Sequence, residues 1–277
     1  MFKPGGQIYS IALAADALLY TGSDSKSIRV WRHPDFPLHS TLKSGSGNVK
    51  ALLVARDQIF SAHGDNKIRI WRRSRSNPNV HKRVATLPKL NRFHNLIRPL
   101  VTDHGTRRVK HSRGTVTCLA YDVNDDLLYM ASSDKTVKVW KVSESKCVET
   151  IEAHIEAVNA VVVRHDGLLF TGSDDNTVKV WRRQRRAQEP KHERMVTLNM
   201  QLSPVKALCL GPDALPVLYA GCYDGYIHYW EEDQFWHRIF HNSGFLRRHV
   251  HSLRCLETVS DLLLIGSVDI CLEKKKI

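Results

Sequence analysis

Histidine and cysteine are the residue types in this 277-residue chain that could most readily bind a metal or perform redox and acid–base chemistry. The chain has 15 histidines and 6 cysteines. The cysteines form no C-x-x-C pair, and the histidines lack the spacing of zinc ligands. Scattered cysteines of this kind indicate reduced thiols in a cytosolic or nuclear protein. We therefore expect no metal site and no cofactor.

Motifs of nucleophilic, phosphate-binding and metal-dependent catalysis are also missing. The sequence has no H-E-x-x-H, no P-loop, no G-x-S-x-G and no protein-kinase signature. Gly45-Ser46-Gly47 has two glycines of a phosphate-binding loop, but it lacks the third and precedes a strand-like segment, which favours an ordinary loop. Apolar runs such as 262–265 are far shorter than a membrane-spanning helix requires. We predict a protein that is not an enzyme and does not span a membrane.

A ten-residue phrase that ends in tryptophan occurs five times in the chain. Its copies are GSDSKSIRVW, AHGDNKIRIW, ASSDKTVKVW, GSDDNTVKVW and GCYDGYIHYW, and they end at Trp31, Trp71, Trp140, Trp181 and Trp230. The tryptophans are separated by 40, 69, 41 and 49 residues. The two shortest separations match the period of roughly 40–45 residues that is typical of a propeller blade.

Each repeat contains the pattern of four short strands. In the unit that ends near residue 198, β-branched runs at 158–163, 168–171, 177–181 and 195–198 are separated by clusters of Gly, Asp and Asn. Such runs and clusters are hairpin signals, and no long segment has a helical period. One small sheet cannot bury both of its faces alone, so repetition around a centre is favoured. We predict an all-β propeller, with residues 1–277 as one domain.

The turn residues extend this pattern. An aspartate stands six residues before four of the tryptophans (Asp65, Asp134, Asp175 and Asp224), and His154 precedes the first strand of its unit. The pattern resembles the WD-repeat family, although Arg, Lys or Glu follows each tryptophan. In that family a His, a Ser or Thr, an Asp and the Trp form a hydrogen-bonded tetrad. The resemblance implies a tetrad of His154, Thr171 or Ser173, Asp175 and Trp181, and a protein-interaction scaffold of seven repeats.

A basic insertion explains the 69-residue separation. Residues 89–113 are expected to form a loop between the second and third blades, and the stretch 72–113 carries a net charge of +11 out of +13. The segment KRVATLPKLNRFHNLIRPL with the basic residues after it resembles the insertion of the Jingubang-type WD-repeat proteins of plants. That resemblance implies a scaffold or adaptor in plant signalling or regulation.

The insertion also supplies the candidate partner-binding residues, which are Arg107, Arg108, Lys110 and Arg113. Three interpretations remain open: a solvated loop without a partner, a site for an acidic protein, or a site for RNA or an anionic lipid surface. We expect a cytoplasmic protein. A nuclear location is the alternative, because the basic run 182–186 has the composition of a short nuclear localisation signal.

The C-terminal part departs from the family pattern. A sixth unit starts near residue 250, but residues 269–277 lack the expected turn, strand and tryptophan. We therefore expect five complete blades, a degenerate sixth without a third strand, and an incomplete ring, with the completeness of the chain left open. An open ring would expose the strands at 8–13 and 262–265 and favour self-association through these edges.

Overall fold

A computed structural model describes residues 8–14, 18–32, 37–43, 45, 47–74, 80–88, 114–184, 191–199, 203–211, 217–232, 240–247, 252–259, 262–267 and 272–276. These residues form six antiparallel sheets, in each of which the strands follow one another in chain order. The prediction of an all-β fold with four-stranded repeating sheets is confirmed. We call the sheets blades 1 to 6.

The strands of the first three blades have the following bounds. Blade 1 contains β1 (Ile8–Leu13), β2 (Leu18–Ser23), β3 (Ser27–Arg32) and β4 (Leu38–Lys43). Blade 2 contains β5 (Val49–Ala55), β6 (Gln58–His63), β7 (Ile68–Arg73) and β8 (His81–Leu87). Blade 3 contains β9 (Val116–Asp122), β10 (Leu127–Ser132), β11 (Thr136–Lys141) and β12 (Lys146–Glu152).

The last three blades continue the same order. Blade 4 contains β13 (Val158–Val163), β14 (Leu168–Ser173), β15 (Thr177–Gln184) and β16 (Lys191–Asn199). Blade 5 contains β17 (Val205–Leu210), β18 (Val217–Cys222), β19 (Tyr226–Glu232) and β20 (Phe240–Arg247). Blade 6 contains β21 (Leu253–Val259), β22 (Leu262–Ser267) and β23 (Leu272–Lys276).

The turn between the second and third strands explains part of the repeated phrase. The residue that follows the turn aspartate has a positive φ in four blades, at Asn66, Lys135, Asn176 and Gly225. Asn and Gly adopt this left-handed conformation with little strain, which is why they recur at hairpin turns. A register shift then occurs between the third and fourth strands directly before each tryptophan of blades 1 to 5.

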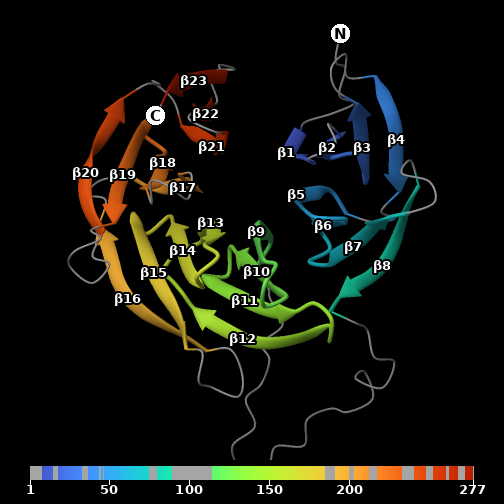
Figure 1. The fold of residues 1–277 in the computed structure, drawn as a ribbon, viewed down its shortest axis with the longest axis horizontal. Helices are drawn as coiled ribbons and strands as arrows, with labels where there is room; N and C mark the ends of the chain where they lie inside the picture. The colour runs from blue at the N-terminus through green and yellow to red at the C-terminus, as the bar shows by residue number, and fades with distance from the viewer. Residues whose placement is uncertain are drawn as a thin grey trace, which may run out of the picture.

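The blades are arranged as an arc around a common centre, with the first strands innermost and the fourth strands outside (Figure 1). Successive blades contact each other through these first strands, from β1 with β5 to β17 with β21. Among the described residues no comparable contact joins β21 with β1, and blades 1 and 6 lie at the two ends of the arc (Figure 1). That the ring stays incomplete remains a prediction.

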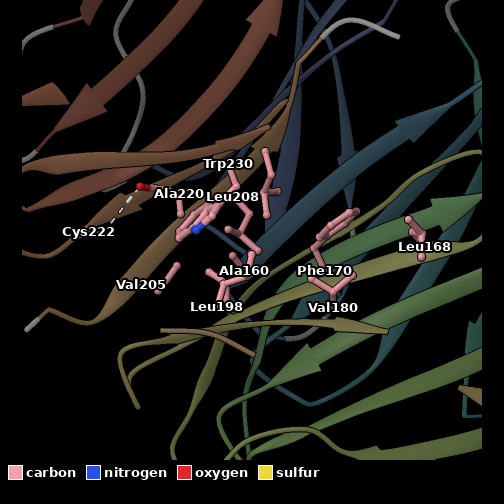
Figure 2. Close-up of a cluster of buried hydrophobic side chains, with 12 residues drawn as sticks. Ala160, Leu168, Phe170, Val180, Leu198, Val205, Leu208, Ala220, Cys222 and Trp230 are labelled. Atoms are coloured by element: carbon pink, nitrogen blue, oxygen red, sulfur yellow. Dashed lines mark hydrogen bonds between the residues drawn. The ribbon is translucent and has the colours of Figure 1, made fainter. Parts of the chain in front are cut away.

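The hydrophobic core consists of five clusters, each between two successive blades. Figure 2 shows the cluster between blades 4 and 5, in which Phe170 and Val180 of blade 4 share a core with Leu208 and Trp230 of blade 5. In every cluster the tryptophan-bearing side of one blade, or its counterpart in blade 6, packs against the opposite side of the blade before it. Stability therefore comes from contacts between neighbouring repeats, as in other repeat architectures.

The expectation that the sixth unit lacks a third strand is wrong. β23 pairs with β22 in antiparallel register, from Leu262 opposite Lys276 to Gly266 opposite Leu272. Strand pairing is made by backbone N–H and C=O groups, which a run of lysines also carries, so the missing Val-x-Val-Trp pattern does not prevent it. The described part of blade 6 has three strands, one fewer than each of the other blades.

Candidate functional site

Blade 4 brings His154, Thr171, Asp175 and Trp181 into one hydrogen-bonded chain. Trp181 Nε1 donates to Thr171 Oγ1 at 3.0 Å, and Thr171 Oγ1 lies 2.7 Å from His154 Nε2. His154 Nδ1 lies 2.9 Å from Asp175 Oδ2. A carboxylate only accepts, so Nδ1 donates to Asp175 and Nε2 of the neutral ring accepts from Thr171. These hydrogen bonds connect the segment before β13 to the β14–β15 turn and to the middle of the blade.

Asp175 is the centre of the turn at one end of this chain. Its Oδ1 accepts from the Thr177 hydroxyl at 2.6 Å and from the Thr177 amide at 3.1 Å. Its Oδ2 accepts from the Ile155 amide at 3.2 Å as well as from His154. Ser173 lies at the same turn but does not bond to His154 or Trp181. Its hydroxyl donates to the Glu156 carbonyl. Of the two hydroxyl residues that the sequence offered, the structure places Thr171 between His154 and Trp181.

Burial determines the electrostatics of this pair. The His154 side chain has no exposed surface, and burial lowers its pKa even though the Asp175 carboxylate acts in the opposite direction. Burial raises the pKa of Asp175, but hydrogen bonds from Thr177 and His154 outweigh it and the net shift is downward. The pair therefore consists of a neutral imidazole and a carboxylate at neutral pH. With their polar atoms bonded within the blade, they are not placed to exchange protons with a substrate.

Blade 2 uses a histidine from a different position. His63 lies at the end of β6, and its Nε2 is 2.8 Å from Ser61 Oγ, which accepts from Trp71 Nε1 at 2.8 Å. Burial is the main reason why the pKa of His63 falls to about 4, and the charge of Arg69 lowers it further. The predicted turn residue Asp65 forms a 2.7 Å ion pair with Arg69 in this blade. The histidine thus comes from the blade's own second strand rather than from the preceding segment.

The other blades hold smaller parts of this arrangement. In blade 1, Trp31 Nε1 donates to Thr21 Oγ1 at 2.9 Å. In blade 3, Met130 stands opposite Leu119 where the hydroxyl residue would be, and Trp140 Nε1 has no hydrogen-bond partner among the described residues. The turn aspartates nevertheless keep their bonds to the turn: Asp134 accepts from the Thr136 amide and hydroxyl, and Asp224 from the Tyr226 amide.

A second type of buried polar contact, between blades, was not anticipated from the sequence. The hydroxyl of Tyr129 on β10 lies 3.1 Å from Nε2 of His192 on β16. Nδ1 of the same histidine lies 2.6 Å from Glu149 Oε2. Tyr20 of β2 and His81 of β8 repeat the contact at 2.9 Å. The available signal was a histidine soon after the tryptophan, in the fourth strand of blades 2 and 4.

Ion pairs reinforce the same interfaces. Arg183 of blade 4 pairs with Asp122 of blade 3 at 2.9 Å, and both side chains are nearly buried. Arg164 of blade 4 pairs with Asp166 at 2.7 Å and with Glu232 of blade 5. These charged groups are paired with one another across the blades, so they position blades rather than a ligand.

The remaining predicted site residues lie elsewhere. Arg107, Arg108, Lys110 and Arg113, with the whole segment 89–113, lie outside the described residues. Within the part of the chain that is described, no group of three or more His, Cys, Asp or Glu side chains is arranged to hold a metal ion. No helix in that part could cross a membrane.

Comparisons with known proteins agree with the repeat pattern. Residues 106–141 and 145–182 match the family "WD domain, G-beta repeat". "Mitochondrial division protein 1" of Schizosaccharomyces pombe is 28% identical over 134 residues, which are 48% of this chain and 20% of that protein. "Myosin heavy chain kinase C" of Dictyostelium discoideum is 26% identical over 158 residues, 56% of this chain and 16% of that protein. The chain thus spans about a fifth or less of these relatives.

A solved structure supports the fold. The WD40 β-propeller domain of Doa1 superimposes with a TM-score of 0.74 at 17% identity, over 98% of this chain and 79% of that domain. Together, the two matched repeats and this structural likeness support a WD-repeat protein with a propeller fold.

Proposed function

We propose that this WD-repeat chain is a non-enzymatic scaffold that binds other proteins. The observation that carries the proposal is the state of its best acid–base pair. His154 and Asp175 are almost fully buried, and their side-chain polar atoms are held by Thr171, Thr177 and the Ile155 amide. A general base must reach a substrate proton through an accessible atom, and this pair offers none. WD40 domains generally serve as interaction scaffolds, in agreement with this conclusion.

The basic segment is the proposed contact for an acidic partner. Its two attachment points lie at the same end of blades 2 and 3: Leu87 is paired with Ile68, and Val116 with Ser132. That end also carries the turns of Asp65 and Asp134. A net charge of +11 in residues 72–113 would attract an acidic surface over several ångströms and accelerate association. We propose that Arg107, Arg108, Lys110 and Arg113 make the contact.

Nucleic acid is the second candidate, and the same charge favours it. Phosphate contacts by Lys and Arg release counterions, so binding would weaken steeply with salt and tolerate any sequence. Single-stranded ligands are usually also stacked on aromatic side chains, and Phe93 is the one aromatic residue between 89 and 113. The protein partner is therefore preferred.

The kinase activity in the name of one relative does not extend to this proposal. The alignment covers 16% of that protein, and repeats alone can account for it. The resemblance of the basic insertion to Jingubang-type plant proteins suggests a role in plant signalling, in the cytoplasm or the nucleus.

The experiment compares two fourfold charge reversals. One replaces Arg107, Arg108, Lys110 and Arg113 by Glu, and the matched control reverses exposed residues outside 72–113, namely Lys26, Lys43, Lys191 and Arg194. Polyglutamate and poly(U) serve as probes over a range of salt concentrations. We expect the first variant to lose at least tenfold in affinity for polyglutamate while its melting temperature stays unchanged, and the control to lose much less.

Three other outcomes would contradict binding of an acidic protein by these four residues. Equal losses in both variants would show that net charge alone attracts the probe. Preferential binding of poly(U), with a log–log salt slope of roughly −3 that only the first variant abolishes, would support the nucleic-acid alternative, since four phosphates are contacted. Unfolding of the first variant would contradict a role in binding alone.

A further inference from the structure

The first strand of blade 1 differs from its five counterparts in exposure. Ile11 stands opposite Thr21, and the residues at the same register position in blades 2 to 6 are Leu52, Leu119, Val161, Leu208 and Leu256. These five are between 1% and 9% exposed, whereas Ile11 is 58% exposed. The residue at this register position is therefore buried in blades 2 to 6 and exposed in blade 1.

The exposure extends over the same side of blade 1. Leu13 is 64% exposed. Leu19 of β2 is half-buried, while its counterparts Ile59, Leu128, Leu169, Leu218 and Leu263 are at most 2% exposed. We call the side formed by Ile11, Leu13 and Leu19 the open face of blade 1. A contiguous apolar face of this kind on a folded protein marks an interaction site.

The five filled interfaces show what kind of surface covers this position. In each of them the covering side belongs to the preceding blade and contributes aliphatic side chains plus one aromatic residue of its second strand. The aromatic residues are Tyr20, Phe60, Tyr129, Phe170 and Tyr219. The recurring partner of the Ile11 position is thus an antiparallel sheet with an aromatic side chain near its centre.

We propose that the open face of blade 1 is a docking site for a β-sheet of a partner protein that presents such an aliphatic and aromatic side. The inference goes beyond the scaffold function proposed above, because it concerns another surface and needs none of the basic residues. Burial of Ile11, Leu13 and Leu19 would supply the hydrophobic driving force, as at the five interfaces within the chain.

A second copy of this chain fits the open face less well. The free surface of blade 6 carries Glu257 opposite Leu264, where blades 1 to 5 have an apolar residue opposite the aromatic one, such as Val162 opposite Phe170. Docking blade 6 of a second copy would carry this carboxylate to a position that holds an apolar residue in each of blades 1 to 5. Desolvation of a carboxylate is costly, so a sheet without such a charge is favoured.

The test supplies a sheet of the proposed chemistry. A duplicate of residues 153–204, which contains the Phe170 side, is fused after Ile277 of the full chain as a surrogate for the partner. We expect the fusion to raise the melting temperature by at least about 4 °C relative to the unfused chain and to protect the β1 amides from hydrogen exchange. The matched control is the same fusion with the duplicate's counterpart of Phe170 replaced by Asp, which should abolish the gain.

Two measurements on the unfused chain complete the test. Ile11→Asp should shift its melting temperature by no more than about 1 °C, because the side chain is exposed, yet remove the gain in the fusion. A loss of several degrees in the unfused monomer would show that the chain already covers this face. A dimer in light scattering that Ile11→Asp dissociates would assign the face to a second copy. Either result, or a fusion without any gain, would overturn the proposal, whereas the charge-reversal experiment would be unaffected.

Discussion

Blades 1 and 4 have almost the same sequence phrase and the same hairpins, but they differ in what surrounds them. In both, the tryptophan donates to a threonine ten residues earlier, at 2.9 Å in blade 1 and 3.0 Å in blade 4. Blade 4 adds His154 and Asp175 to this bond and packs on blade 3. In blade 1 the side with Ile11, which corresponds to the side of blade 4 that packs on blade 3, is exposed. Local sequence therefore determines the hairpin, while the neighbouring blade determines how much stability the same residues contribute.

The largest difference is expected for a leucine that both blades share. Leu169 and Leu19 each stand opposite the tryptophan of their blade. Leu169→Ala should lower the free energy of unfolding by about 2–5 kcal/mol, because it leaves a cavity in a filled interface. Leu19→Ala should cost about 1 kcal/mol or less, since the side chain is already partly in water. Denaturant melts of the two variants measure this, and equal losses would mean that blade 1 is covered in solution.

Blade 2 extends the comparison through pH. The pKa of His63 is about 4 in the folded protein and near 6.5 when the chain is unfolded, so the unfolded chain binds a proton first as the pH falls. The contribution of His63 is complete above about pH 6.5 and is lost as the pH falls toward 4. Between pH 7 and pH 5 we expect a loss of roughly 2 kcal/mol in stability. Urea unfolding at the two pH values should show this loss reduced in His63→Asn.

The matched control is the same substitution at an exposed histidine, His165→Asn, which leaves the buried His63 in place. A loss in His63→Asn as large as the loss in this control would assign the acid sensitivity to other groups. His154 is the first of these, because burial lowers its pKa too.

The turn aspartates are expected to differ by a smaller amount. Asp175→Ala should cost about 1–3 kcal/mol, because it removes the acceptor of His154, Thr177 and Ile155 and leaves buried donors unpaired. Asp24→Ala in blade 1 should change stability by less than about 0.5 kcal/mol, since Asp24 is exposed. Thermal melts of both variants provide the measurement. Similar shifts for the two would contradict the special role of the blade 4 turn.

The smallest effect concerns the tyrosine–histidine contacts. Tyr129→Phe and Tyr20→Phe should each cost about 1 kcal/mol, the net value of one buried hydrogen bond. Phenylalanine fits this position, because blades 2 and 4 carry Phe60 and Phe170 there. Tyr9→Phe, at an exposed tyrosine, is the matched control. Chemical denaturation should separate the two buried sites from the control, and a neutral Tyr129→Phe would show that His192 is satisfied by Glu149 alone.

Several features of the blades follow from local sequence, and others depend on distant segments. The turn that contains Asp175 and Asn176 is encoded within a few residues, because the carboxylate bonds to the amide two residues later and Asn tolerates a positive φ. The contact of Tyr129 with His192 joins residues 63 positions apart, so no local pattern specifies it. The third strand of blade 6 was missed because its side-chain pattern is atypical, although its backbone pairs normally.

The sequence by itself determined the repeat, the four-stranded hairpin order and the turn chemistry, because these depend on the side-chain period and on residues a few positions apart. Only the tertiary structure decided which hydroxyl forms a hydrogen bond with His154 and which aliphatic side chains are covered. It also decided that in blade 2 the histidine bonded to the hydroxyl is His63 of the blade's own second strand. Burial is a property of the neighbouring blade, and the same apolar position can be filled, as at Val161, or open, as at Ile11. Packing partners from other parts of the chain make that difference, and no single repeat contains the information.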